Sequence, residues 1–184
     1  MSEIIKLTAD VDVDEYYENY VDFEKFSQLC IEEQESLGYN WSYPPFDFDV
    51  DELWNSFKKL KLIAFKIEFS SEEQASTLSD KEMDYVLKRF ERYKVKLMND
   101  LYVLEDENSQ ALFLGKCNLC MRCTREFGMP CKMPFKMRYP LEALGADVDK
   151  TAEDIFGLKI EYAENGKLPP YLVFVGGVLY DKIR

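Results

Sequence analysis

Four of the five cysteines lie within fifteen residues, in the stretch CNLCMRCTREFGMPC that begins at Cys117. Their spacing is C-x2-C-x2-C-x7-C. Because the first three cysteines are each three residues apart, one irregular loop can direct three thiolates to three irons of a cubane. The fourth must arrive from outside that turn, and Gly128 and Pro130 help because one permits a left-handed backbone and the other stiffens the approach. The predicted metal ligands are Cys117, Cys120, Cys123 and Cys131.

The spacing favours a 4Fe–4S cluster over other centres. Bacterial ferredoxins use the same first three spacings, although their fourth thiolate comes from elsewhere in the chain. Zinc is the alternative, since four cysteines can form a tetrahedral site, but zinc sites more often have two C-x2-C pairs separated by a longer insertion. Free structural thiols are the third interpretation. The pattern thus predicts a metal more specifically than it predicts which metal.

The sequence contains no histidine. This excludes Ser-His-Asp and Cys-His nucleophiles and every zinc site that uses histidine. The chain also has no nucleophile elbow, no GxGxxG and no Walker loop. No catalytic residues can be named from the sequence, and whether the protein is an enzyme stays open.

The formal net charge of −12 argues against general binding to nucleic acid or to anionic membranes. A basic island nevertheless coincides with the cysteine-rich loop 116–138, where one glutamate faces six cations: Lys116, Arg122, Arg125, Lys132, Lys136 and Arg138. Nearby cations would favour the reduced state of a cluster. They could instead be solvated loop residues, or a docking patch for an acidic redox partner.

The fifth cysteine, Cys30, is expected to be a buried small apolar residue, with a role as an extra ligand or a redox thiol as the lesser alternative. The chain has no signal-peptide pattern and no apolar run long enough to cross a bilayer. We therefore expect a cytoplasmic protein. Thiols are kept reduced there, so a cysteine cluster indicates metal binding or redox chemistry and not disulfides.

Helical spacing predicts several helices around these motifs. One runs from the N-cap Asp22 to Gly38, with apolar residues from Phe23 to Leu37 on one face. A short one starts at Asp51, and a long one follows the capping box of Ser79 and Glu82. The apolar stripe of the long helix is Met83, Val86, Leu87, Phe90, Leu97, Met98 and Leu101. After the loop, residues 140–157 predict two short helical pieces, the second capped by Asp147 or Asp149 and ended by Gly157.

Strands are expected at the N-terminus as an edge, at 59–69 with Leu60, Leu62 and Ala64 on one face, and at 111–114. Two more are expected around the turn signal Asn165-Gly166, the last apolar enough to be central. The order strand, long helix, strand suggests a crossover unit. We predict an α+β fold in a single domain, 1–184, with one mixed sheet covered by helices and an irregular cysteine-rich metal-binding loop.

The chain resembles an uncharacterised family of predicted metal-binding proteins. The resemblance rests on FSQLCIEEQESLGYNWSYPPFDFD, on GKCNLCMRCTREFGMPCKMPFKMRYPLEALGADV and on YLVFVGGVLY, so it spans nearly the whole length. It implies metal binding and an iron–sulfur protein, but it implies no reaction. It also implies further amino-terminal cysteines at the places of Cys30, Glu33 and Tyr43, so that a second metal site of the family is lost or altered here.

Three hypotheses follow. The protein is an iron–sulfur protein that exchanges electrons with a protein partner, or an interaction module stabilised by zinc, or a cluster-dependent enzyme. In the last case the aromatic segment YNWSYPPF would line a substrate pocket, although aromatic residues beside prolines more often pack in the core. The first hypothesis is the one that we favour.

Overall fold

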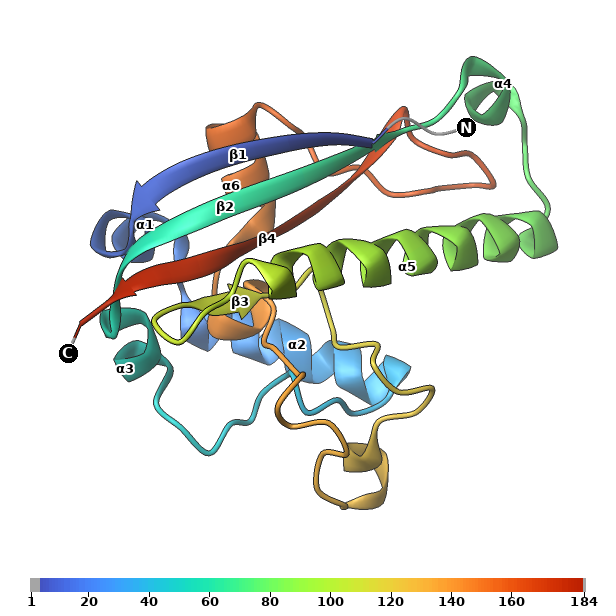
Figure 1. Cartoon of the computed structure of the whole chain (residues 1–184). Coiled ribbons are helices and arrows are strands. Elements are labelled where there is room, and N and C mark those ends of the chain that lie inside the picture. Colours follow the sequence, from blue (N-terminus) through green and yellow to red (C-terminus); the bar gives the residue numbers. More distant parts are fainter. Residues whose placement is uncertain (1–3, 184) are drawn as a thin grey trace.

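Four strands form one sheet in the computed structural model, which describes residues 4–183. They are β1 (Ile4–Asp12), β2 (Phe57–Glu68), β3 (Gln110–Leu112) and β4 (Tyr171–Lys182), in the order β1-β2-β4-β3 (Figure 1). The predicted α+β fold with one sheet is confirmed, as are the edge position of β1 and the central position of β4. Each pair of these neighbouring strands is antiparallel, so the sheet is not mixed.

The strand β2 is buried on both of its faces. Leu60, Leu62 and Ala64 point to one side, as predicted, and are fully buried. Ile63, Phe65 and Ile67 are buried on the opposite side. A strand that is covered on both faces carries an almost continuous apolar run, which explains why alternation described only half of it.

The long helix α5 (Asp80–Val103) covers one face of the sheet (Figure 1). Its capping box is formed as predicted, with the Ser79 Oγ 2.6 Å from the Glu82 carboxylate. The second half of its apolar stripe packs on Phe65 and Ile63 through Leu97, Met98 and Leu101. Leu87 was expected in this stripe but is 44% exposed, whereas Met83 and Val86 pack with Phe90 on Ile67 of β2.

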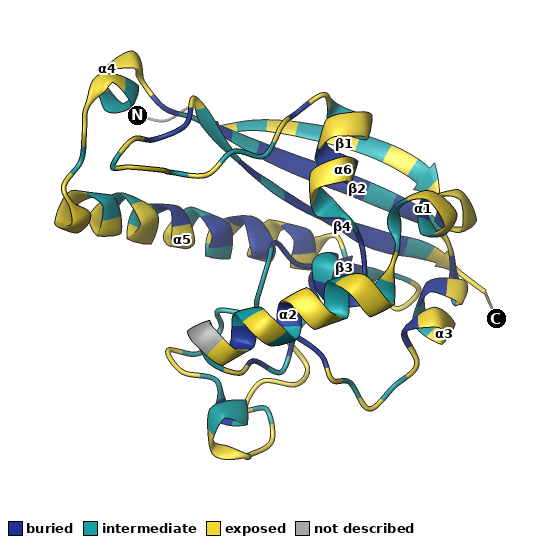
Figure 2. Ribbon diagram, turned by 180° about the vertical axis from the view of Figure 1, so that it is seen from behind, coloured by how far each residue is buried: buried dark blue, intermediate teal, exposed yellow. Residues whose placement is uncertain are grey.

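Shorter helices cover the other face (Figure 2): α1 (Val13–Tyr20), α3 (Val50–Asn55) and α6 (Val148–Phe156). Trp54 is at the centre of this layer, completely buried, with its indole N–H donating to the Leu144 carbonyl at 3.0 Å. The helix α6 begins after its N-cap Asp147 and ends at Gly157, as predicted. The large apolar area buried here is the main source of stability for this half of the fold.

The helix α2 (Phe23–Leu37) begins after Asp22, whose side chain accepts from the Lys25 N–H, and ends at Gly38. Both boundaries confirm the prediction, although the side chain of Leu37 lies outside those that the structure describes. The helix α2 packs against the short 3-10 helix η2 (Glu142–Leu144). Gly145 makes this possible, because a Cβ there would come within 2.6 Å of the Phe23 Cα.

After α5 the chain adds only the short strand β3 to the sheet. β2 and β3 are parallel to each other and joined through α5, with β4 between them, so the predicted crossover spans one intervening strand. β3 pairs only with residues 177–179 of β4, and the chain then crosses Gly176. The strand expected before Asn165 is absent, and a single bridge, Glu164 with Lys167, remains of that hairpin. The described part also includes α4 (Ser71–Ala75), which was not predicted.

Candidate metal centre

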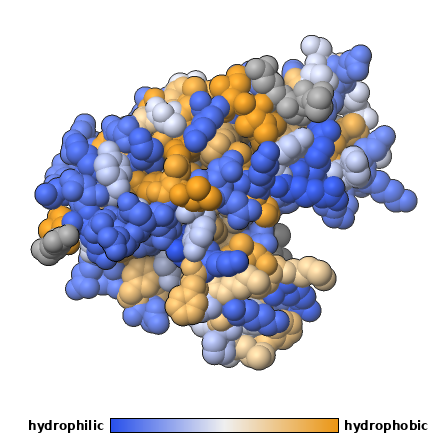
Figure 3. Space-filling model, in the orientation of Figure 1, coloured by the Kyte–Doolittle hydropathy of each residue, from blue (hydrophilic) through white to orange (hydrophobic). Residues whose placement is uncertain are grey.

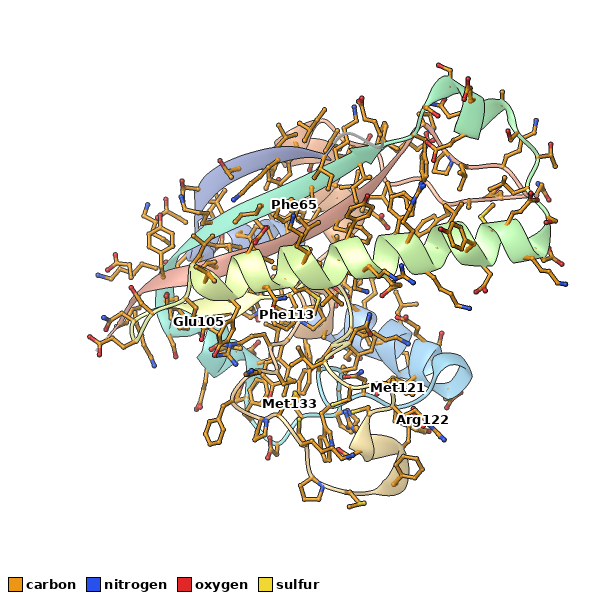
Figure 4. The ribbon with its side chains drawn as sticks, turned by 45° about the vertical axis from the view of Figure 1, so that its right-hand side comes forward. Phe65, Glu105, Phe113, Met121, Arg122 and Met133 are labelled. Carbon is orange, nitrogen blue, oxygen red and sulfur yellow. The ribbon has the colours of Figure 1, made fainter. Side chains whose placement is uncertain are left out.

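The four predicted ligands line one small cavity, of about 20 Å³. It lies in the lobe that projects away from the sheet, on which Figure 4 labels Met121, Arg122 and Met133. All four cysteines are half-buried, and none of them forms a disulfide. The structure therefore places around one cavity the residues that the spacing selected: Cys117, Cys120, Cys123 and Cys131.

The seven residues between the third and fourth cysteine fold into a compact turn. They form the 3-10 helix η1 (Thr124–Phe127), which ends at Gly128 in the left-handed conformation, as predicted, with φ of 64°. Thr124 then closes the turn, since its hydroxyl donates to the Pro130 carbonyl at 2.8 Å and its carbonyl accepts from the Met129 N–H. This turn returns the chain to the cavity at Cys131.

The aromatic segment 39–46 holds the cysteine loop against the body of the protein. The Asn40 amide donates to the Cys117 carbonyl at 2.8 Å, and the Cys117 N–H donates to the Ser42 hydroxyl at 3.0 Å. The Trp41 indole donates to the Met129 carbonyl at 3.0 Å. Sequence reasoning considered this segment only as core or as a pocket wall. We call residues 39–46 the clasp segment, because they hold the loop in place. Their contacts with the loop join residues about eighty positions apart in the sequence, which no local pattern reveals.

Arg125 completes the clasp from the side of the loop. Its guanidinium donates to the carbonyls of Asn40, Tyr43 and Pro45, and it stacks on the Trp41 ring, 5.0 Å from its centroid. A planar guanidinium suits this purpose because it can donate to several acceptors at once. Burial lowers the pKa of Arg125, while the nearby Cys123 thiol acts in the opposite direction. A fixed cation thus lies beside the cavity.

Backbone N–H groups also point at the thiols. The Trp41 N–H donates to the Cys123 sulfur at 3.4 Å, and the Leu119 N–H donates to that of Cys117. Burial, followed by repulsion from the other three cysteines, raises the pKa of Cys117 to about 11. A metal must therefore displace protons to bind here. Among residues 4–183, no three Cys, Asp or Glu side chains converge closely enough to hold a single metal ion.

Comparison with known families agrees with a metal-binding role. The family model described as "Predicted metal-binding protein (DUF2284)" matches residues 17–180, which is most of the chain. The chain belongs to this family. No curated protein and no solved structure matches it. For members of a predicted metal-binding family, a cavity lined by four cysteines is the natural place to look for the metal.

The arginines of the basic island have structural partners. Arg122 pairs with Glu126 at 2.6 Å, and Arg138 pairs with Glu105 at 2.7 Å with both side chains largely buried. The interpretation of the whole island as solvated loop residues is therefore wrong for Arg125 and Arg138. Lys132 and Lys136 are exposed surface cations, and Lys132 also lines the cavity.

Cys30 does not line the cysteine cavity. It is 4% exposed and packs with Tyr43 and Ala143, which confirms the expectation of a buried residue. Burial, and then the charges of Glu142 and Glu33, raise the pKa of its thiol to about 12. Cys30 lines a second cavity, separate from the one lined by the four cysteines. Glu33 and Tyr43, which occupy the other two positions where the resemblance implies cysteines, line it too.

Replacing Cys30 with serine is expected to lower the free energy of unfolding by about 1 kcal/mol and to leave the metal content unchanged. The reason is that a hydroxyl needs a stronger hydrogen bond than the 3.8 Å contact from the Cys30 thiol to the Glu142 carbonyl provides. Urea titration and metal analysis of the same preparation check both parts. Loss of metal in this variant would instead make Cys30 a ligand.

No helix within residues 4–183 is long and apolar enough to cross a membrane.

Proposed function

We propose that the protein binds a 4Fe–4S cluster through Cys117, Cys120, Cys123 and Cys131 and exchanges single electrons with a partner protein in a reducing compartment such as the cytoplasm. The observation that carries the proposal is that these four cysteines border one cavity. A bound cluster would supply a one-electron couple.

The surroundings of the cavity suit a thiolate-bound cluster. Its sulfurs accept hydrogen bonds from backbone N–H groups, and such bonds, together with nearby positive charge, raise the reduction potential of iron–sulfur centres. Here the N–H groups of Trp41 and Leu119 donate to sulfur. Arg125, held by three carbonyls, supplies a cation that cannot swing away. Because these donors and this cation are held in place, they would keep the reduction potential of a bound cluster constant.

The surface around the cavity supports the docking of a protein. Between residues 121 and 135 the exposed large apolar side chains are Met121, Phe127, Met129, Met133 and Phe135. Figure 3 shows the corresponding apolar surface on the projecting lobe, next to hydrophilic atoms. Methionine and aromatic side chains are enriched at interfaces, and an exposed cluster of them has a cost unless it is used. The exposed Lys132 and Lys136 would attract an acidic partner and speed its approach.

The test is metal and sulfide analysis of protein that has been purified without oxygen, together with its visible spectrum. About four irons and four sulfides per chain, with a broad band near 400 nm that dithionite bleaches reversibly, is the expected result. Reversible bleaching matters because a redox-silent cluster would not serve electron transfer.

One zinc per chain and no colour would overturn the proposal. The protein would then be a zinc-stabilised interaction module, and removal of the zinc by a chelator would unfold the lobe. A bound cluster that dithionite cannot reduce would retain the ligand assignment and reject the electron-transfer role.

A further inference from the structure

A second cavity, of about 420 Å³, lies between α2, α5 and the free edge of β4. It exists because β3 is short. Before Gly177, no strand of the described chain pairs with this edge of β4. Val173, Phe174 and Val175 of that part form one wall of the cavity. Phe26 and Leu29 of α2 form the opposite wall. The volume is within the range of roughly 300 to 1,000 Å³ that is typical of small-molecule sites.

One end of this cavity is polar, and its most unusual member is Lys94. The residue is only 7% exposed and lies in the middle of α5, on the same face as Phe90 and Leu97. Its ion-pair partner is Glu91, which is half-exposed and 3.5 Å away. A buried ammonium normally has close anionic partners that satisfy its three donors. Among the described residues Lys94 has this one ion-pair partner, and its charge also acts on Glu142, which lines the cavity with it.

Glu142 lies across from Lys94 at the same end. Its Oε1 accepts from the Tyr43 hydroxyl at 3.2 Å. A Cβ added to Gly115 would lie 3.3 Å from the Lys94 Nζ and 3.6 Å from the Glu142 Oε1, so both groups border the space beside this glycine. Burial raises the pKa of Glu142 to about 7, which leaves a carboxyl that can carry a proton at neutral pH and donate it in a hydrogen bond.

The remaining charged and titratable groups that line the cavity determine which ligands it can accept. They are Cys30 and Glu33 on α2, Tyr43 on the clasp segment, Asp149 on α6, and Tyr162. Glu33 and Asp149 are acidic, and their charges contribute to raising the pKa of Tyr162 after burial, the main cause. A ligand with a second negative charge would meet these carboxylates, and like-charge repulsion is an effective means of rejecting it.

We propose that this cavity binds a small monocarboxylate with an apolar body. The carboxylate would occupy the space beside Gly115, where it pairs with the Lys94 ammonium and accepts a hydrogen bond from protonated Glu142. The apolar body would lie between the β4 wall and Phe26. This site uses none of the four cysteines, and it does not depend on which metal they bind.

The test is ligand binding to the full-length protein, measured by ligand-observed NMR and calorimetry. The probes share a phenylalkyl body and differ in the head group: phenylbutanoate, its amide, phenylbutylamine and the dicarboxylate benzylsuccinate. Phenylbutanoate is expected to bind most tightly. Lys94→Met should weaken it roughly tenfold or more, the loss of one hydrogen bond to a buried charge. Lys96→Met, which removes an exposed lysine of the same helix, should change nothing.

The proposal fails if phenylbutanoate shows no binding up to about 10 mM, which is weaker than a specific pocket of this size would give. It also fails if the amide, the amine or benzylsuccinate binds as well as phenylbutanoate does. Equal binding to wild type and Lys94→Met, with circular dichroism showing that the variant is folded, would place the carboxylate elsewhere.

Discussion

Replacing Cys131 with serine is expected to remove the bound metal or to convert the centre to one of lower nuclearity. Cys131 lines the cavity with the other three cysteines, and it is brought there by the closed turn of η1. A neutral hydroxyl is a harder and weaker ligand than a thiolate for iron and zinc alike. Iron, sulfide and zinc content, measured after gel filtration without oxygen, reports the change.

The matched control is Cys30→Ser, which makes the same chemical change at a cysteine outside this cavity. Cys131→Ser should also lower the melting temperature more than Cys30→Ser does, since metal binding contributes directly to the stability of the lobe that it orders. Wild-type metal content in Cys131→Ser would remove Cys131 from the ligand set. The seven-residue spacing between Cys123 and Cys131 would then have no role in metal binding.

The helices around the site were predictable because their signals are local. Asp22 and Gly38 bound α2, and Ser79 with Glu82 starts α5, in each case through hydrogen bonds within a few residues. The sheet was less predictable. Residues 158–163 alternate as a strand would, but they pair with no strand of the described chain: Leu158 is buried in the core, and Ile160 and Tyr162 line the second cavity. Strand pairing depends on distant partners, which a local pattern does not contain.

The cavity lined by the four cysteines was predictable because these cysteines are close in sequence, and the residues that support it were not. Asn40, Trp41 and Ser42 reach the loop from about eighty residues away. The second cavity had one signal that could have been used. Lys94 falls four residues after Phe90 and three before Leu97, so a lysine interrupts the apolar stripe of α5 where the helix faces the sheet. A charged residue at such a position points to a buried partner or to a binding site.

Glu142→Gln is expected to stabilise the protein at pH 8 and to leave its stability nearly unchanged at pH 4.5. Burial raises the pKa of Glu142 from 4.5 to about 7, even though Lys94 and the Tyr43 hydroxyl act to lower it. Below pH 4.5 the carboxyl is protonated in both the folded and the unfolded chain, so it has no ionisation cost. Between pH 4.5 and 7 only the unfolded chain releases the proton, and stability falls by about 1.4 kcal/mol per pH unit.

Above pH 7 the cost is constant, at about 3 kcal/mol. Glutamine does not titrate, and its Oε1 can still accept from Tyr43, so the variant avoids this cost without losing the contact. Urea titrations of wild type and variant at both pH values measure the difference, and the contribution of the metal cancels because the cysteine lobe is the same in both. Glu107→Gln, at an exposed position, controls for the change in net charge. A variant that is less stable than wild type at pH 8 would mean that Glu142 is ionised in the folded protein and paired with Lys94, and the space beside Gly115 would then have no unsatisfied cation to offer a ligand.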